Sequence, residues 1–409
     1  MVSSRLQIVV IGGGAAGFFG AIAAANQSPE AQVTILEAGR QLLSKVRISG
    51  GGRCNVTHAC FEPALLVQNY PRGGKALRGA FSRFQAKDTI AWFQEQGVTL
   101  KTEADGRMFP VTDDSETIVQ CLTQAADEAG VRVRAGASVT DVTRDGRFHL
   151  TMKSGQVMEA DRLLLATGSS PQGYGIARAL GHTLLPPVPS LFTFNVSDPR
   201  LQDLAGVSVD PVQVRLRLAD GSSLEQTGPL LMTHWGLSGP AVLKLSAWGA
   251  RSLHASQYQA TLMVNWLPKY KPDVLRQQIL AVKSQLPQRS IAANCPVPLP
   301  RRLWDRLLEA AGITQETRWA ELSNKNLHLL MQELTQGTYT IQGKGAFKEE
   351  FVTCGGVDLK EVDFKTMESR ICSGLFFAGE ILDIDGITGG FNFQAAWTTG
   401  WLAGQAIGR

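Results

Sequence analysis

The feature that most constrains this chain is a glycine-rich turn, GGGAAG at residues 12–17, between an apolar strand pattern and a helix pattern. Glu37 ends the next predicted strand, 20 residues after Gly17. In a βαβ unit of this length such a turn binds a dinucleotide: Gly12 permits the turn, Gly14 lets the backbone approach the pyrophosphate, and Gly17 lets helix and strand pack closely. The helix N-terminus offers N–H groups to phosphates, and Glu37 can bind ribose hydroxyls. The alternative is a glycine-rich turn without a ligand.

A membrane segment is another interpretation of this region, because residues 8–25 form one continuous apolar run. The run has about the length of a short span or a signal core. Four of the six residues after Ile11 are glycine, which disfavours a helix there and suits a tight phosphate-binding turn. Basic residues hardly flank the run, so we predict no membrane segment.

The composition is typical of a globular cytoplasmic enzyme. A chain of 409 residues, 44% of them hydrophobic, can form roughly two to three domains. Its six cysteines contain no C-x-x-C pair, which predicts a reducing compartment and neither a disulfide framework nor a metal site. The basic residues are scattered, so we read the net charge of +4 as weak evidence for a nucleic-acid partner and do not expect one. We expect a small-molecule substrate and predict no particular oligomeric state.

A second glycine-rich motif, KVRISGGGRCN at residues 45–55, follows the first βαβ unit. Its three successive glycines can bring the backbone close to a flat or charged ligand, and Lys45, Arg47 and Arg53 add positive charge near the expected phosphates. An extended cofactor such as FAD needs a second loop of this kind, whereas an NAD dehydrogenase does not; the alternative is a flexible surface loop. We expect Arg53 and Asn55 to bind the flavin rather than the substrate.

Cys54 allows two interpretations. A redox pair beside the flavin would need a second thiol within reach, and Cys60 follows six residues later. No spacing rule supports that pair, so we favour a packed thiol near the cofactor.

Two later motifs resemble strand ends of the flavoproteins of the glutathione-reductase superfold. An apolar strand that ends at Thr167-Gly168 resembles the second fingerprint of that superfold. Val139, earlier in the chain, takes the position where the superfold places backbone against adenine. The segment GLFFAGE at residues 374–380 resembles the strand whose terminal acid, here Glu380, binds the ribityl chain.

A helix is predicted after Gly390, over the segment FNFQAAWTTGWLAGQAIG. Its N-terminus would point at the N1/C2=O edge of a flavin, where a helix dipole stabilises the anion formed on reduction. Its small residues would let it pack tightly against a neighbour. The alternative is an ordinary C-terminal helix without a ligand.

The motifs occur in an order that resembles one family. The segments GGGAAG, SGGGRCNVTH, GPLLMTHWGLSGPAVLKLS, FVTCGGVDLKEVDFKTMESR and GLFFAGEILDIDGITGGFNFQAAWTTGWLAG are similar to those of the bacterial YhiN-like flavoproteins, also described as the BaiN/RdsA or aminoacetone-oxidase type. The resemblance covers residues 6–408 and implies FAD as the cofactor. Some members are described as amine oxidases acting on aminoacetone, others as reductases of activated double bonds. Ser169 departs from the glycine of many members, which concerns a local turn.

The resemblance and the residue pattern predict the same fold class. This is an α/β fold with a discontinuous, glutathione-reductase-type FAD-binding Rossmann domain and an inserted β-barrel plus helical module. A proline cluster at residues 186–189 is typical of a crossing between domains. The predicted FAD-binding domain comprises residues 1–190 and 346–409, and the insert comprises 191–345, mainly β over 191–267 and mainly helical over 268–336.

Few residues are candidates for proton transfer. His234 lies in a glycine-flanked loop of the predicted insert, and an imidazole suits proton transfer near neutral pH. The slightly favoured alternative is a structural histidine, and His58 has a weaker case. Asp383 and Asp385 could attract an amine substrate or cap the loop before the last helix.

We predict an FAD-dependent oxidoreductase that transfers hydride through non-covalent FAD. Amine oxidation with O₂ and NAD(P)H-dependent reduction of an activated double bond are the alternative reactions; a flavin-bound RNA-interacting or scaffold protein is the alternative of another class. The chain has no second G-x-G-x-x-G between a strand and a helix, so NAD(P)H, a candidate transient donor, would have to reach the flavin directly. The residues predicted to bind FAD are Gly12, Gly14, Ala15, Ala16, Gly17, Glu37, Ala38, Lys45, Gly51, Gly52, Arg53, Cys54, Asn55, Val139, Ala166, Thr167, Gly168, Gly379, Glu380, Gly390, Phe391 and Asn392.

Overall fold

The computed structural model describes residues 5–218, 221–345 and 352–409. The chain forms two compact units, which we call unit 1 (residues 1–188 and 348–409) and unit 2 (residues 189–347). The predicted start of the second part of the FAD-binding domain, at residue 346, lies outside the described residues.

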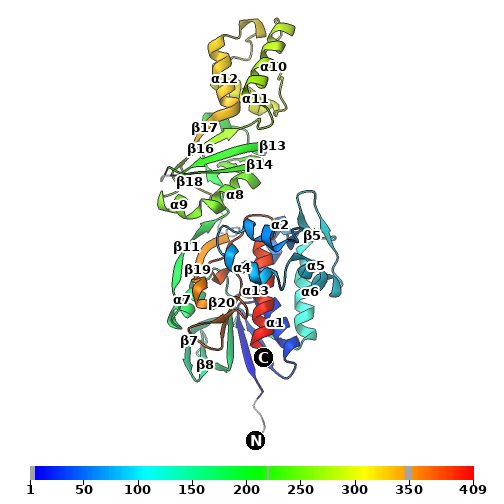
Figure 1. Ribbon diagram of the computed structural model, residues 1–409, viewed down its shortest axis with the longest axis vertical. Coiled ribbons are helices and arrows are strands. Elements are labelled where there is room, and N and C mark those ends of the chain that lie inside the picture. Colours follow the sequence, from blue (N-terminus) through cyan, green and yellow to red (C-terminus); the bar gives the residue numbers. More distant parts are fainter. Residues whose placement is uncertain (1–4, 219–220, 346–351) are drawn as a thin grey trace. The chain divides into compact units, whose positions relative to one another are not determined.

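A seven-stranded sheet forms the centre of unit 1 (Figure 1). Its order is β20-β21-β22-β10-β1-β2-β6, and the neighbours from β22 to β6 pair in parallel. Strands β1, β2 and β10 consist mostly of buried Val, Ile and Leu, as expected of parallel strands covered on both faces. The strands are β1 (Gln7–Ile11), β2 (Gln32–Leu36), β6 (Arg132–Arg134), β10 (Arg162–Leu165), β20 (Val362–Asp363), β21 (Glu368–Ser369) and β22 (Leu375–Phe377).

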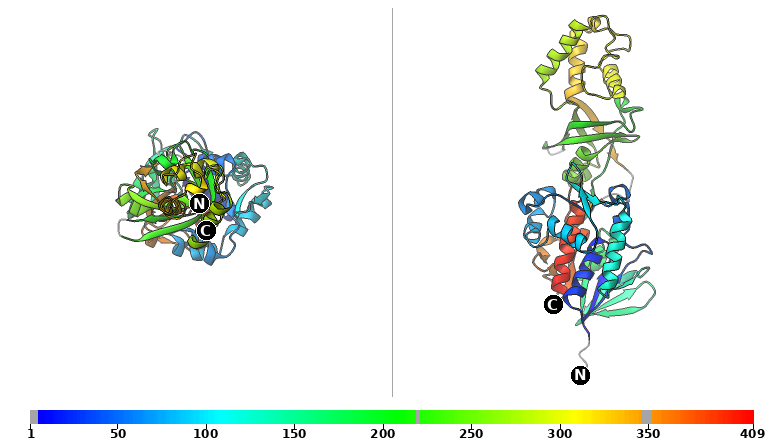
Figure 2. Two further views of the ribbon diagram at one scale, coloured as in Figure 1. Left: turned by 90° about the horizontal axis from the view of Figure 1, so that it is seen from above. Right: turned by 90° about the vertical axis from the view of Figure 1, so that its right-hand side faces the viewer.

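Two helices rich in small residues, α1 (Ala15–Gln27) and α13 (Phe391–Ile407), lie side by side in unit 1 (Figures 1 and 2). They approach closely because glycines stand where they cross: a Cβ atom on Gly404 would lie 2.4 Å from the carbonyl oxygen of Gly20. The predicted tight packing of the last helix is confirmed. The crossing also fixes the N-terminal ends of the two helices relative to each other.

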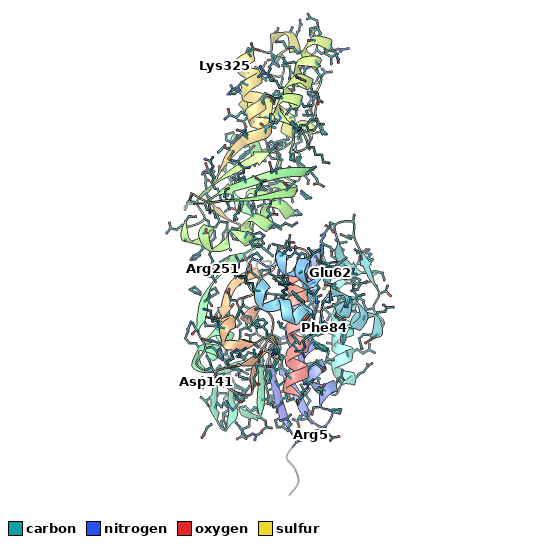
Figure 3. All side chains as sticks on the ribbon, viewed as in Figure 1. Arg5, Glu62, Phe84, Asp141, Arg251 and Lys325 are labelled. Atoms are coloured by element: carbon teal, nitrogen blue, oxygen red, sulfur yellow. The ribbon has the colours of Figure 1, made fainter. Side chains whose placement is uncertain are left out.

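Other helices of unit 1 are α2 (Ser44–Gly52), α3 (Pro63–Leu66), α4 (Gly74–Phe81), α5 (Ala86–Glu95), α6 (Ser115–Glu128) and α7 (Pro171–Ala179). The sequence pattern predicts one helix over residues 76–96, and this prediction is wrong because the chain breaks between α4 and α5. The side chain of Asp88 accepts the N–H of Gln85 at 2.8 Å and so starts a new helix. Phe84, labelled in Figure 3, is buried at the break and stacks on Trp401, with 5.2 Å between ring centroids.

Unit 1 also contains smaller sheets. The dipeptide Asp145-Gly146 is typical of a hairpin turn, and the structure has one there, since Asp145 pairs with Arg147 across the turn. One three-stranded sheet consists of β7 (Val139–Asp145), β8 (Arg147–Met152) and β9 (Val157–Ala160). A second consists of β3 (Thr57–His58), β5 (Arg107–Pro110) and β4 (Leu100–Thr102), and β11 (Leu184–Ser190) pairs with β19 (Val352–Val357).

The sheet of unit 2 closes on itself. Its order is β17-β16-β13-β14-β15-β12-β18, and only Gln342 separates β17 (Gly337–Ile341) from β18 (Gly343–Lys344). Both ends of the sheet therefore belong to one segment, which pairs with β16 on one side and with β12 on the other. The result is the predicted small barrel. Its other strands are β12 (Phe194–Asn195), β13 (Ser208–Arg217), β14 (Ser223–Thr233), β15 (Gly236–Ser238) and β16 (Ala260–Asn265).

Helices α10 (Pro272–Gln285), α11 (Arg301–Ala310) and α12 (Asn324–Gln336) gather at one end of this barrel (Figure 2). The stretch predicted to be mainly β also contains two helices that were not predicted, α8 (Pro240–Trp248) and α9 (Ala250–Ala255). Proline at the first position of α8 is an ordinary helix start. In the parts of the chain that the structure describes, none of the helices combines the length and the apolar character needed to cross a membrane.

Candidate functional site

The GGGAAG motif forms the turn between β1 and α1. Gly14 is the N-cap of α1, and Ala15, Ala16 and Gly17 are the first residues of the helix. The first N–H groups of a helix have no acceptor within it. Gly12 has a φ of +112°, and a Cβ atom there would lie 2.3 Å from the carbonyl oxygen of Ala166. A Cβ atom on Gly17 would lie 1.9 Å from the carbonyl oxygen of Gly12, so only glycine fits at either position. The turn leaves the helix N-terminus suited to bind a phosphate.

Glu37 directly follows β2 and is bonded to this turn. Its carboxylate accepts the N–H of Gly13 at 2.6 Å and the N–H of Gly39 at 2.7 Å. Ala38, the next residue, is exposed. The acid that we expect to bind ribose thus lies against the glycine turn, and its contact with ribose stays a prediction.

The carboxyl ends of β1, β10 and β22 lie beside one another. Ile11 is opposite Leu165, and Leu165 is opposite Phe377, in parallel register. The residues that follow these strands therefore meet at one edge of the sheet, where open α/β sheets bind ligands. They include Ala166, Thr167 and Gly168 after β10, and Gly379 and Glu380 after β22.

The second glycine-rich motif is connected to this edge by an ion pair. Lys45 Nζ binds Glu380 Oε2, the acid that we expect to bind the ribityl chain. The first half of the motif is helical in α2 rather than a loop, whereas Gly51 and Gly52 have left-handed φ angles of 69° and 84°. A Cβ atom on either glycine would have no neighbour within 4 Å among the described residues, so their backbone is open to a ligand.

Arg53 and Cys54 are both packed against other residues of the protein. Arg53 Nη1 donates to Glu103 Oε1 at 2.7 Å, and its guanidinium lies 3.9 Å from the ring centroid of Phe109. Glu103 and Phe109 would therefore compete with a flavin for Arg53. Cys54 is fully buried, and burial raises the pKa of its thiol to about 12. A thiol that stays protonated is a poor nucleophile, which favours the packed-thiol interpretation over a redox pair.

Asn55 joins the second motif to the N-terminus of α13. With its amide oriented to satisfy both neighbours, it donates to the carbonyl oxygen of Thr57 at 3.1 Å and accepts the N–H of Gly390 at 3.0 Å. Gly390 is the N-cap of α13. Asn392, in the first turn, accepts the N–H of Gly386 at 2.8 Å and donates to its carbonyl oxygen at 2.9 Å. These bonds fix the start of the helix.

Phe391, the first residue of α13, is buried between aromatic neighbours. Its ring stacks on His58 with 4.6 Å between centroids, and its carbonyl oxygen accepts the hydroxyl of Tyr70 at 2.6 Å. His58 Nδ1 lies 3.0 Å from the carbonyl oxygen of Gly389. His58, the weaker catalytic candidate, thus packs against the loop that begins α13.

Val139 and His234 lie on elements other than the strand ends and helix starts described above. Val139 begins β7, and its carbonyl oxygen accepts the side-chain amide of Gln172. His234 is exposed at the two-residue tip of the hairpin between β14 and β15 in unit 2. The contact of Val139 with adenine and the proton transfer by His234 stay predictions.

The pair of Arg72 and Asp385 was not predicted. Asp385 is fully buried, and both of its carboxylate oxygens bind the guanidinium of Arg72. Asp383 is also buried and accepts the N–H of Gly355 at 2.8 Å. The two acids are bonded inside unit 1, which favours the structural interpretation over attraction of an amine. No local sequence signal identifies Arg72, because its partner stands far along the chain.

The site fits the predicted cofactor. The first turn of α1 and Glu37 would hold the pyrophosphate and ribose of FAD, and Glu380 would hold the ribityl chain. The fit rests on the first N–H groups of α1, which have no acceptor within the helix, and on the open backbone of Gly51 and Gly52, where a Cβ atom would have no neighbour within 4 Å among the described residues.

Comparison with known proteins identifies relatives of the whole chain. A family model described as "HI0933-like protein Rossmann domain" matches residues 6–406. A 3-dehydro-bile acid delta(4,6)-reductase of Clostridium scindens is 31% identical over 408 residues, which cover 98% of each chain. A protein named ribosomal RNA dihydrouridine synthase from Escherichia coli is 31% identical over 98% of each chain, and that from Haemophilus influenzae is 32% identical over 100%.

Among solved structures, the 3-ketosteroid delta1-dehydrogenase from Sterolibacterium denitrificans is similar with a TM-score of 0.51 at 10% identity. The match covers 99% of this chain and 100% of that chain, and at this identity it concerns the fold alone. The family match confirms the predicted Rossmann-type FAD-binding fold and the resemblance to the YhiN-like flavoproteins.

Proposed function

Because this chain belongs to the HI0933-like Rossmann family, we propose that it uses FAD to reduce a carbon–carbon double bond conjugated to a carbonyl group. The membership confirms the predicted enzyme class, an FAD-dependent oxidoreductase. The choice of reaction rests on one observation: relatives that align over almost their whole length bear names of one type of reduction.

These names describe the same change on two different molecules. A 3-dehydro-bile acid with delta(4,6) unsaturation has double bonds conjugated to its 3-oxo group, and the uracil ring of uridine has a double bond conjugated to a carbonyl. Saturation adds a hydride to the electron-poor carbon and a proton to its neighbour. FAD, when bound and first reduced by an electron donor, would supply the hydride.

The residues of the chain would position the cofactor and move the proton. The N-terminus of α13, fixed by Asn55 at Gly390, carries the partial positive charge of the helix dipole and can stabilise a negative charge on a neighbouring ring. Lys45 and Glu380 would hold the ribityl chain and the adjoining phosphate. The exposed imidazole of His234 is the candidate proton donor, because an imidazole can give up a proton near neutral pH.

NAD(P)H is the proposed electron donor. The chain has no second nucleotide-binding fingerprint, so the nicotinamide would reach the flavin directly. Amine oxidation has less support, because Asp383 and Asp385 are buried and bonded inside unit 1.

Ribosomal RNA is a candidate substrate, although the sequence alone gave us no expectation of a nucleic-acid partner. Unit 2 has 16 Lys and Arg against 11 Asp and Glu, whereas unit 1 has 24 against 25. The positive charge is therefore concentrated in unit 2, where RNA phosphates would be attracted. In the described part of its helical segment, six exposed cations form no ion pair: Lys269, Lys271, Arg276, Arg289, Arg302 and Lys325, the last labelled in Figure 3.

The test compares substrates offered to the FAD-loaded protein. A 3-oxo-4,6-diene bile acid and a ribosomal RNA transcript are each incubated anaerobically with NADPH or NADH, and aminoacetone is incubated with O₂. Mass spectrometry of the products should show the gain of two hydrogens in one of the unsaturated substrates. Oxidation of aminoacetone without reduction of either unsaturated compound would contradict the proposal.

Two controls sharpen this test. His234→Asn should leave the reduction of FAD by NADPH unchanged and slow product formation by about 100-fold or more, as loss of a general acid does. An unchanged product rate would show that His234 is not the proton donor and would favour the alternative of a structural histidine. Reduction of RNA, if observed, should weaken steeply as salt increases, because phosphate contacts release counterions.

A further inference from the structure

A pocket in unit 1 is lined by positive charges from three segments of the chain. Its volume is about 220 Å³, several times that of a water molecule. Arg83 comes from the break between α4 and α5, Lys365 from the turn between β20 and β21, and Arg409 from the end of α13. Neither Asp nor Glu is among the described residues that line the pocket. The pocket therefore offers positive charge without a carboxylate to neutralise it.

The pocket lies away from the site predicted for FAD. It adjoins the C-terminal end of α13, marked C in Figure 1, whereas FAD is predicted at the N-terminal end of this helix of 17 residues. A helix of that length is roughly 25 Å long. Arg162, the first residue of β10, donates to the carbonyl oxygen of Ile407 at 2.6 Å, whereas Thr167 and Gly168 follow the other end of β10. A ligand in the pocket would therefore be additional to FAD.

None of the three cations has an ion-pair partner among the described residues. Asp363, the acid nearest to Lys365 in the sequence, has other partners: it accepts the backbone N–H of Lys365 at 2.9 Å, and its carboxylate lies 3.6 Å from Arg370 Nη2. The guanidinium of Arg83 donates to the carbonyl oxygen of Lys365 and so holds two like-charged residues at one pocket. Because like charges repel each other, an anion between them would be stabilised.

The dipole of α13 does not cancel this positive charge. The last carbonyl groups of a helix together carry a partial negative charge of about half an elementary charge. Arg162 binds two of these groups, the carbonyl oxygens of Ala406 and Ile407, and the backbone N–H of Arg409 donates to Ala406 as well. These donors offset the negative end of the helix, and the pocket stays positive.

Two neutral side chains add hydrogen-bond donors. Thr366 Oγ1 accepts the N–H of Glu368 at 3.2 Å, which leaves the hydroxyl hydrogen to donate to a ligand. Gln405 of α13 also lines the pocket, and its amide can donate. A phosphate group presents three strong acceptor oxygens and needs donors from several sides, whereas a single arginine fork can satisfy a planar carboxylate. Donors from three segments therefore fit a phosphate group better.

We propose that this pocket binds a phosphate group through Arg83, Lys365 and Arg409. The group would belong to inorganic phosphate or to a small phosphorylated molecule, and the recognising chemistry is the same for both. The inference goes beyond the proposed function and does not depend on the use of FAD.

The test is a calorimetric titration of the full-length, FAD-loaded protein with sodium phosphate and, separately, with ribose 5-phosphate. Ionic strength is held constant with NaCl, and bound FAD keeps the N-terminus of α1 occupied. Arg83→Gln and Arg409→Gln should each raise the Kd about 10-fold or more, as expected for hydrogen bonds between charged groups. Thr366→Val, which changes no charge, should raise it about 3- to 10-fold. Tighter binding of ribose 5-phosphate than of phosphate would identify a phosphorylated molecule as the ligand, and the reverse would identify inorganic phosphate.

Arg178→Gln is the matched control, because Arg178 is an exposed cation of α7 that does not line the pocket. It removes the same charge, and its Kd should stay within about twofold of the wild type. Equal weakening in Arg178→Gln would show a general attraction of anions and overturn the proposal. A wild-type Kd above about 10 mM for both probes would also overturn it.

Two further readouts keep the result interpretable. The side chain of Arg409 has no hydrogen bond or ion pair among the described residues, so Arg409→Gln should keep the thermal midpoint of the wild type without phosphate. Weaker binding of a ribosomal RNA transcript by Arg83→Gln, without binding of either small probe, would assign the charges to RNA and overturn the proposal. If the protein binds no FAD, the proposed function fails, and the comparison of Arg83→Gln with Arg178→Gln still tests the pocket.

Discussion

Replacing Gly404 by alanine should destabilise unit 1, although alanine is the better helix former. In a helix interior the change from glycine to alanine normally stabilises by about 1 kcal/mol. At this position the new Cβ atom would lie 2.4 Å from the carbonyl oxygen of Gly20, 2.5 Å from Ala23 Cβ and 2.9 Å from the N atom of Ala24. These atoms belong to the facing helix α1, and two of them are backbone atoms that no rotamer change can move. Helices α13 and α1 must therefore separate.

The expected magnitude follows from two opposing terms. Inserting a methyl group into a closely packed contact costs about 1–3 kcal/mol or more, against the gain of about 1 kcal/mol in helix propensity. The two terms leave a net loss of up to about 2 kcal/mol in the free energy of unfolding of unit 1. The affinity for FAD should fall as well, because α1 and α13 carry the two helix N-termini that would face the cofactor.

Gly79→Ala provides the matched control. Gly79 is an exposed glycine of α4, and a Cβ atom there would have no neighbour within 4 Å among the described residues. This variant should be more stable than the wild type by about 0.5–1 kcal/mol. Urea unfolding followed by tryptophan fluorescence measures both variants. Equal or greater stability of Gly404→Ala compared with Gly79→Ala would refute the argument from the helix crossing.

Three further predictions concern buried groups of unit 1. Burial lowers the pKa of His182 below its ordinary 6.5, so the folded state binds fewer protons than the unfolded state, and stability should fall as the pH drops below about 6.5. His182→Gln should flatten this dependence in urea unfolding, and an unchanged slope would contradict it. Asp385→Asn removes the carboxylate that binds the guanidinium of Arg72 inside unit 1 and should cost about 3–5 kcal/mol of stability in the same assay; a loss below about 1 kcal/mol would show that the pair is not needed. Cys54, whose pKa is raised to about 12, should resist iodoacetamide in the folded protein while the half-buried Cys60 reacts, and faster labelling of Cys54 would revive its redox role.

The first βαβ unit could be predicted from sequence because all of its signals are local. The apolar strand, the glycines at Gly12 and Gly17, and the acid at Glu37 stand within one short segment, and each has a physical role in the turn. The expectation that the later motifs lie close in space to the first βαβ unit came from the family resemblance. Spacing along the chain does not indicate that β22 pairs with β10 in parallel register.

The errors in the predicted fold have different causes. The break between α4 and α5 contains no proline or glycine, and it depends on the burial of Phe84 against Trp401 of the distant α13. Helix α8 has local signals of its own, since Gly239 is its N-cap, Pro240 is its first residue and Gly249 is its C-cap. Because the surrounding residues 191–267 have a pattern typical of strands, no helix was predicted there.

The unpredicted site residues depend on contacts between distant segments. Arg72 and Asp385 meet only because the loop before α13 lies against the segment before α4, and nothing near either residue indicates the pair.

The most direct test of the proposed function is an anaerobic redox cycle of the FAD-loaded protein, followed by its visible spectrum. NADPH or NADH should bleach the flavin absorbance near ~450 nm, because a hydride passes to the isoalloxazine ring. Addition of the 3-oxo-4,6-diene bile acid or the ribosomal RNA transcript, without O₂, should then restore the oxidised spectrum as the double bond is saturated. Bleaching by aminoacetone instead, with recovery only when O₂ is admitted, would show an amine oxidase and contradict the account.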